Sequence, residues 1–232
     1  MAGGGLLYWF GIWIPNEPSR TALPVRGIDV SHHQGVIDWP AVKNAGTQFV
    51  YIKATEGADF KDADFGRNWK GSAGVVIPHG AYHFFTLGTS GSSQAANFIS
   101  VVPVEPEALP PAIDLEFSGY NLRRRPSRDE FARELSVFYD AIVARYQKVP
   151  VIYTAYNFRN DYLKSMPVER LWIREIFTKP RLGSAPWTFW QFSARGKVPG
   201  ISTPADLDVF NGNAETFTRF LKQERGTADE TR

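Results

Sequence analysis

Two acidic residues, Asp114 and Glu116, stand two positions apart in the stretch PPAIDLEF. In a β-strand, residues i and i+2 face the same side, so their carboxyls would point one way from Cα atoms about 6.5–7 Å apart. The opposite face would be apolar, with Ile113, Leu115 and Phe117. Placing two acids at the end of a buried strand is costly, so we expect them to have a chemical purpose.

Glycoside hydrolysis requires a carboxyl pair of this kind. One carboxylic acid protonates the oxygen of the departing sugar, and the other, ionised, stabilises the cationic transition state. A simpler alternative is that Asp114 caps the next helix and Glu116 is solvated. Because one short motif carries a real risk of a chance match, the spacing alone leaves both interpretations open.

Composition narrows the class of protein. At 232 residues the chain is long enough for one domain that buries roughly 70–75% of its unfolded surface. Its aromatic content of 14% serves a core and also suits the apolar faces of sugars. A net charge of +2, with no recognisable nucleic-acid-binding motif, gives no reason to expect nucleic acid as a partner. The absence of cysteine excludes disulfides and cysteine zinc sites.

Strand and helix patterns alternate along the chain. Besides the strand carrying the acid pair, strands are expected at 27–31, 48–55, 78–85, 149–154, 170–175, 188–193 and 206–210. Helices are expected at 39–45, 62–74, 91–102, 127–146 and 214–223. This order indicates a parallel barrel, and the later connections are too short for full helices. We therefore predict an α/β fold, a single irregular TIM-like (β/α) barrel.

The predicted organisation has three parts: an N-terminal extension at 1–25, a catalytic barrel at 26–213, and a C-terminal helix with a charged tail at 214–232. Within the extension, Leu6–Ile14 (LLYWFGIWI) is an apolar run too short to cross a bilayer. It is either the remainder of a longer export signal or membrane anchor, or an element that packs on the domain.

Polar residues gather where the predicted strands end, which in a parallel barrel is the active-site end. They are Asp29, Lys53, Glu56, Tyr82, His83, Asp114, Glu116, Tyr153, Trp190, Gln191, Asp206 and Asp208. No histidine spacing matches a metal site, and there is no Gly-x-Ser-x-Gly elbow or glycine-rich phosphate loop. We expect neither a metal nor a cofactor. A basic run, Arg123–Arg125 with Arg128, contacts substrate carboxylates or forms a solvated turn.

Taken in order, ten motifs resemble glycoside hydrolase family 25, the lysozyme-type muramidases, over about residues 26–212. The motifs are Gly27–Gly35 (GIDVSHHQG), Ile37–Trp39 (IDW), Tyr51–Gly57 (YIKATEG), Gly80–Phe85 (GAYHFF), Gln94–Phe98 (QAANF), Pro111–Glu116 (PAIDLE), Pro150–Thr154 (PVIYT), Leu171–Ile173 (LWI), Trp190–Ser193 (WQFS) and Asp206–Gly212 (DLDVFNG). Three positions depart from the family pattern: Arg174 and Glu175 carry charges where a small residue and an aromatic are more usual, and Asp208 stands where Asn is also common. These departures bear on subsite preference more than on activity.

The resemblance implies a metal-free enzyme that cleaves the β-1,4 bond from N-acetylmuramic acid to N-acetylglucosamine in peptidoglycan, with retention. The family's general acid corresponds to Glu116 and the neighbouring carboxylate to Asp114, with Asp29 and Asp206 lining the site. Since clustered carboxyls cannot all ionise freely, we expect Glu116 to keep a proton while Asp114 stays ionised. Asp114 then attacks the anomeric carbon or steadies the substrate's own acetamido group, and we favour the second.

Aromatic residues complete the implied site. Tyr153 would hydrogen-bond the acetamido group, a sugar platform would be formed by Tyr82, Trp172 and Trp190, and Gln191 would contact substrate. Each ring could instead be core. Peptidoglycan strands are the expected partner, no partner protein is implied, and the expected location is extracytoplasmic. Two other functions stay open: a glycan-binding barrel without catalysis, and a glycosidase for another N-acetylated polymer such as chitin.

Overall fold

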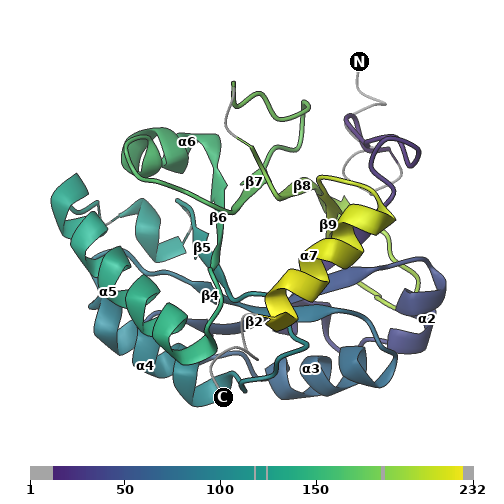
Figure 1. Cartoon of the computed structure of the whole chain (residues 1–232), viewed down its shortest axis with the longest axis horizontal. Coiled ribbons are helices and arrows are strands. Elements are labelled where there is room, and N and C mark those ends of the chain that lie inside the picture. Colours follow the sequence, from purple (N-terminus) through teal and green to yellow (C-terminus); the bar gives the residue numbers. More distant parts are fainter. Residues whose placement is uncertain (1–12, 118, 124, 184–185, 227–232) are drawn as a thin grey trace.

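The computed structural model describes residues 13–117, 119–123, 125–183 and 186–226. Within these ranges one sheet closes into a barrel, because β1 pairs with both β2 and β9 (Figure 1). The strands are β1 (Arg26–Val30), β2 (Phe49–Glu56), β4 (His79–Phe84), β5 (Ala112–Leu115), β6 (Val151–Ala155), β7 (Leu171–Arg174), β8 (Phe189–Gly196) and β9 (Ala205–Phe210). A short strand outside the barrel, β3 (Phe60–Lys61), pairs antiparallel with β2. The predicted α/β barrel is confirmed.

The sequence had led us to expect a parallel barrel, but one strand of the barrel runs antiparallel to its neighbours. From β1 round to β8 every neighbouring pair is parallel, whereas β9 runs antiparallel to both β8 and β1. The reason is the connection from β8 to β9, residues 197–204. A parallel crossover needs a dozen or more residues, so this short connection reverses the chain. The beginning of β9 therefore lies at the same end of the barrel as the carboxyl ends of the other strands.

Helices cover the outside of the first half of the barrel (Figure 1). They are α2 (Trp39–Asn44), α3 (Phe65–Gly74), α4 (Gly91–Val101) and α5 (Arg128–Tyr146), with the single turns η1 (His32–Gln34) and η2 (Gly119–Leu122). Between β6 and β7, the described residues form only the short α6 (Tyr156–Phe158) and η3 (Arg159–Leu163). The described residues between β7 and β8, and those between β8 and β9, form no helix. This asymmetry is the irregularity that the short connections predicted.

Helix α5 forms as its sequence indicates. The Ser127 hydroxyl accepts a hydrogen bond from the Glu130 amide at 3.2 Å and caps the first turn. Its predicted buried face is confirmed: Phe131, Leu135, Phe138, Ile142 and Tyr146. These side chains pack between the helix and the outer face of the sheet, where Ile113 and Leu115 of β5 are fully buried. The outward residues of β5 are thus held in the core, which leaves the alternate residues pointing into the barrel.

Helix α7 (Ala214–Gly226) packs its phenylalanines against the amino-terminal end of the barrel interior. Phe217 and Phe220 contact a layer of rings that includes Phe49, Phe189 and Phe210. Phe217 is 5% exposed. The end of the barrel opposite the carboxyl ends of the strands is therefore filled with apolar side chains.

Replacing Phe217 with alanine is expected to destabilise the protein by about 3–5 kcal/mol, the usual cost of removing a buried phenylalanine ring. The free energy of unfolding from denaturant titration measures the effect. Lys222→Ala, an exposed position on the same helix, is the control and is expected to stay within about 0.5 kcal/mol of wild type. A Phe217→Ala protein as stable as that control would contradict the role given to α7.

Most of the apolar run at Leu6–Ile14 lies outside the described residues. Ile14 packs on an outer cluster with residues of β7 and β8, and the Asn16 side-chain amide donates to the Glu175 carbonyl at 2.9 Å. The connector that follows the run is thereby tied to the outside of the barrel. No helix among the described residues is both long enough and apolar enough to cross a bilayer. The three-part organisation stays a prediction.

Candidate active site

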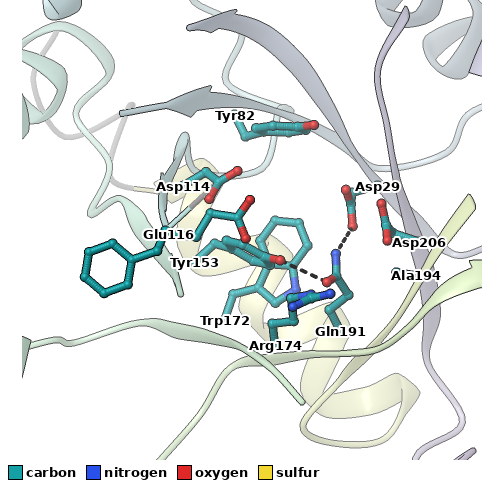
Figure 2. A pocket seen from close by; sticks show the side chains of 11 residues that line it. Asp29, Tyr82, Asp114, Glu116, Tyr153, Trp172, Arg174, Gln191, Ala194 and Asp206 are labelled. Atoms are coloured by element: carbon teal, nitrogen blue, oxygen red, sulfur yellow. Dashed lines mark hydrogen bonds between the residues drawn. The ribbon is translucent and has the colours of Figure 1, made fainter. Parts of the chain in front are cut away.

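A pocket of about 340 Å³ opens at the carboxyl ends of the barrel strands (Figure 2). It is lined by Asp29, Tyr82, Asp114, Glu116, Phe117, Tyr153, Trp172, Arg174, Gln191, Ala194 and Asp206. Of the nine predicted site residues, eight are in this set, and Trp190 is not. Residues separated by as much as 177 positions in sequence thus meet in one cavity whose wall is rich in carboxyls.

The inward alternation of the strands gathers the acids. Asp114 points inward from β5 beside Tyr153 of β6, its partner in register, and Glu116 follows directly after the strand. Across the pocket, Asp29 of β1 and Asp206 of β9 are partners in register. Figure 2 shows Asp114 and Glu116 on one side and Asp29 and Asp206 on the other. The pocket can therefore hold a sugar between two pairs of carboxyls.

Phe117 packs, as expected, against the buried cluster that contains Ile113 and Leu115, although strand β5 itself ends at Leu115 and Phe117 is only partly buried. The Phe117 ring lines the pocket and packs on Phe158 with ring centres 4.8 Å apart. It is an apolar part of the wall that the strand pattern did not predict.

A chain of hydrogen bonds crosses the bottom of the pocket (Figure 2). The Tyr153 hydroxyl donates to Gln191 Oε1 at 2.9 Å, and Gln191 Nε2 donates to Asp29 Oδ2 at 2.8 Å. All three side chains are buried, which fixes their rotamers. The chain holds Asp29 in position and leaves the oxygen of the Tyr153 hydroxyl able to accept a further hydrogen bond.

Tyr153→Phe is expected to lower kcat/KM by about tenfold, because one hydrogen bond of this buried chain is lost and Gln191 Oε1 is left unpaired. Steady-state hydrolysis of a glycan substrate measures this, with circular dichroism to verify folding. Tyr156→Phe, on the outer side of the barrel, is the matched control. Equal kcat/KM values for Tyr153→Phe and wild type would show that the Tyr153 hydroxyl does not contribute to catalysis.

Asp208 and Trp172 form the floor below the acids. The Trp172 indole N–H donates to Asp208 Oδ1 at 2.8 Å, and Trp172 is only 2% exposed. Burial and the neighbouring Asp206 raise the pKa of Asp208. With so little of its face open, Trp172 supports the pocket from below more than it offers a free platform for a sugar. Tyr82 on the wall is only half-buried, so it has more exposed surface than Trp172 to offer a sugar.

Burial shapes the ionisation of the acids that face the cavity. It is the largest cause that raises the pKa values of Asp29, Asp114 and Asp206, and carboxyls nearby raise them further. For Asp114 the nearby carboxyls include Glu116, while Lys53 acts in the opposite direction. Asp114 Oδ1 also has no hydrogen-bond partner among the described residues.

The raised pKa of Asp114 acts against the expectation that this residue stays ionised, which remains a prediction. Asp114 is 8% exposed and Glu116 is half-buried, so desolvation disfavours the charge of Asp114. The sequence could not show this, because it fixes the side of the strand and not the depth of burial. After burial, the charge of Glu116 is the next largest cause that raises the pKa of Asp114.

Trp190 points away from the pocket. It follows the alternation of β8, in which Gln191 faces inward and its neighbours face outward. Its ring packs against Trp187 and Phe192 outside the barrel, and its indole N–H donates to the Glu175 carbonyl at 2.8 Å. Its position removes Trp190 from the sugar platform and assigns it to the outer core.

Three lining residues were not predicted as site residues: Phe117, Arg174 and Ala194. Arg174 could have been found, because it is two positions from Trp172 on β7 and so shares its inward face. Ala194 could not, because β8 shifts register between Gln191 and Ser193 and this irregularity changes which residue faces inward.

The basic run after β5 is partly described, with Arg124 outside the described residues. Arg125 lies over the Phe117 ring, with its guanidinium carbon 4.1 Å from the ring centre, and pairs with Asp161 at 3.5 Å. Arg128 Nε donates to the Asp161 carbonyl at 2.6 Å. These contacts place the run at the pocket edge and give two of its arginines protein partners.

His83, also near the end of a predicted strand, faces the helices. Its ring bonds Thr55 and Gln94 at 2.7 and 3.1 Å, and burial lowers its pKa to about 3. It is a neutral core side chain. Among the described residues, no group of three or more His, Asp or Glu side chains is arranged to hold a metal ion.

A barrel with a carboxyl pair at the strand ends, facing further acids across a sugar-sized pocket, defines a glycoside hydrolase. The sequence profile described as "Glycosyl hydrolases family 25" matches residues 28–201. The chain belongs to this family.

Individual relatives agree with that assignment. Lysozyme M1 of Streptomyces globisporus is 37% identical over 220 residues, which cover 88% of this chain and 72% of that protein. The structure of a family 25 glycosyl hydrolase from Bacillus anthracis matches with a TM-score of 0.83 and 36% identity, over 89% of this chain and 97% of that one. The bacterial lysozyme of Streptomyces coelicolor matches with a TM-score of 0.78 and 36% identity, over 88% and 98%. The predicted family and enzyme class are confirmed.

Proposed function

We propose that this protein is a muramidase that cleaves the β-1,4 bond from N-acetylmuramic acid to N-acetylglucosamine in peptidoglycan, with retention of configuration. The observation that carries the proposal is the carboxyl pair of Asp114 and Glu116 on one wall of a pocket whose other wall holds Asp29 and Asp206. Similarity to lysozymes over most of the chain supports peptidoglycan as the substrate.

Glu116 is the general acid. It follows β5 at the pocket and is less buried than Asp114, so it can reach the glycosidic oxygen of a sugar chain. In the first step it gives a proton to that oxygen as the bond to the anomeric carbon breaks. In the second step its carboxylate takes a proton from water while the water oxygen bonds to the anomeric carbon and displaces the group that became attached there in the first step.

Asp114 acts on the sugar whose bond is cleaved. The acetamido oxygen of that sugar attacks its own anomeric carbon and forms a cyclic oxazolinium ion, and Asp114 accepts a hydrogen bond from the acetamido N–H. Its buried carboxylate is most stabilising when positive charge develops there. The Tyr153 hydroxyl helps to orient the acetamido group. Direct attack by Asp114 is the alternative and gives the same stereochemistry.

The substrate places the enzyme's action outside the cytoplasm, at the cell wall. We propose a secreted or periplasmic protein. Detection of the full-length protein in cytoplasmic extracts alone, after cell fractionation, would contradict this location.

A substrate panel tests the function. The protein is incubated with purified peptidoglycan and with chitin oligomers, and soluble fragments are separated from bound protein. Release from peptidoglycan with little release from chitin supports a muramidase. Binding without release would favour the glycan-binding alternative, and release from chitin alone would favour the other glycosidase. Proton NMR of the first product tests retention, since the β anomer is expected before mutarotation.

A further inference from the structure

Arg174 brings a positive charge into a pocket lined by four carboxyls. It is the one cationic residue among the described residues that line the cavity. It ends β7, next to Gln191 of β8 and Ala155 of β6 in register, on the inward face that it shares with Trp172. Figure 2 shows its side chain on the wall opposite Tyr82. The fold therefore places a guanidinium where a bound sugar would lie.

The Arg174 guanidinium is available to a ligand. Within the part of the chain that the structure describes, it forms no ion pair and no hydrogen bond, although Glu116 and Asp206 line the same pocket. Other arginines are engaged: Arg170 pairs with Glu224 at 2.7 Å and Arg125 with Asp161 at 3.5 Å. The charge of Arg174 is felt in the pocket, since it lowers the pKa of Asp206 against the stronger effect of burial.

An acidic pocket repels an anionic substrate unless a cation receives its charge. The guanidinium presents a planar fork of donors that matches the two oxygens of a carboxylate. N-acetylmuramic acid differs from N-acetylglucosamine in its 3-O-lactyl group, which carries a carboxyl. A single cation among four acids would therefore both favour the muramyl sugar and fix its position in the pocket.

We propose that Arg174 is a specificity residue that binds a carboxylate on the 3-O-substituent of the muramyl sugar. This inference rests on the proposed muramidase function and names the group by which the enzyme separates muramyl glycans from neutral polymers. The carboxylate is the free lactyl acid of a strand stripped of peptide, or an acid of the stem peptide. The chemistry of recognition is the same for both.

Two matched pairs of substrates separate these sources. The first pair is peptide-stripped glycan strands with lactyl carboxylates free, and the same strands converted to methylamides with carbodiimide. The second is soluble peptidoglycan fragments with stem carboxylates free, and the same fragments converted to methylamides. The preference is the ratio of kcat/KM for the acid over the methylamide in each pair. It is measured for wild type, Arg174→Gln, Arg174→Lys and the control Arg125→Gln.

Wild type is expected to prefer the acid form of one pair by about tenfold or more, the usual effect of a charge-assisted hydrogen bond. Arg174→Gln is expected to bring that ratio close to one, and Arg174→Lys to an intermediate value, because it keeps the charge without the fork. Arg125 already pairs with Asp161, so the Arg125→Gln variant is expected to keep the preference.

Four outcomes would overturn the inference. Wild type could show no preference in either pair, Arg174→Gln could keep the preference, or Arg125→Gln could lose as much of it as Arg174→Gln. Finally, Arg174→Gln could lose kcat/KM equally on the acid and the methylamide, with a shifted pH profile. The last would mean that Arg174 only adjusts the ionisation of Asp206. A wild-type enzyme that cleaves none of the four substrates would overturn the muramidase function itself. Cleavage without preference would overturn the role of Arg174 alone.

Discussion

Glu116→Gln is expected to lower turnover of peptidoglycan by at least about 10²-fold, the lower end of what general acid catalysis contributes. Glutamine keeps the shape of the side chain and cannot deliver a proton to the glycosidic oxygen. Because Glu116 lies at the pocket and outside the apolar core, folding is expected to be unchanged. The initial rate of reducing-end release measures turnover, and thermal unfolding measures stability.

The matched control for this variant is Glu56→Gln. Glu56 ends β2 at the same end of the barrel, and its carboxylate pairs with Lys53 at 2.6 Å instead of lining the pocket. This change removes one negative charge near the site without touching the proposed acid, so turnover is expected to stay within about threefold of wild type. Near-normal activity of Glu116→Gln would refute the assignment of Glu116.

Asp114→Asn is expected to lower turnover by about 10²–10³-fold and, at neutral pH, to raise the free energy of unfolding. The first effect follows because a neutral amide cannot stabilise the positive charge of the transition state. The second follows from burial, which raises the pKa of Asp114 well above 3.8. The gain expected for removing such a group is about 0.5–2 kcal/mol.

The sign of the pH dependence follows from proton binding. Between pH 3.8, where an unfolded aspartate titrates, and the raised pKa of folded Asp114, the folded state holds more protons than the unfolded state. Its stability therefore falls as pH rises through that window, and the penalty is fully present above it. The advantage of Asp114→Asn should grow across the window and vanish below it.

Denaturant titrations of wild type and Asp114→Asn at several pH values measure this advantage, with activity assayed on the same preparations. The control is Asp161→Asn, an exposed carboxyl outside the pocket whose effect on stability should be small. Activity of Asp114→Asn close to that of wild type would remove Asp114 from the proposed mechanism. A stability difference from wild type that does not vary with pH would contradict the effect of burial on the pKa of Asp114.

The sequence was sufficient to predict features that depend on local periodicity. Asp114 and Glu116 share a face because side chains alternate along a strand, and the face of α5 with Phe131 and Phe138 is buried because apolar residues recur every three or four positions. The same rule, applied to β8, would have placed Trp190 outside once Gln191 was assigned to the pocket. Arg174 follows from Trp172 in the same way.

Features set by tertiary structure could not be predicted. The direction of β9 depends on how the chain crosses from β8, and it decides that Asp206 meets Asp29 at the active-site end. The register shift in β8 that brings Ala194 into the wall has no signal in the residues themselves. The ionisation of Asp114 depends on its depth in the pocket and on neighbours from several strands, which only the folded barrel provides.

The most direct test is to identify the sugar at the new reducing end. Purified peptidoglycan is digested with wild type and with Glu116→Gln, reduced with borohydride, and the products are analysed by mass spectrometry. Fragments ending in reduced N-acetylmuramic acid with wild type, and their near absence with Glu116→Gln, are the predicted result. Fragments ending in reduced N-acetylglucosamine, or equal yields from the two proteins, would contradict the assignment of the bond or of its acid.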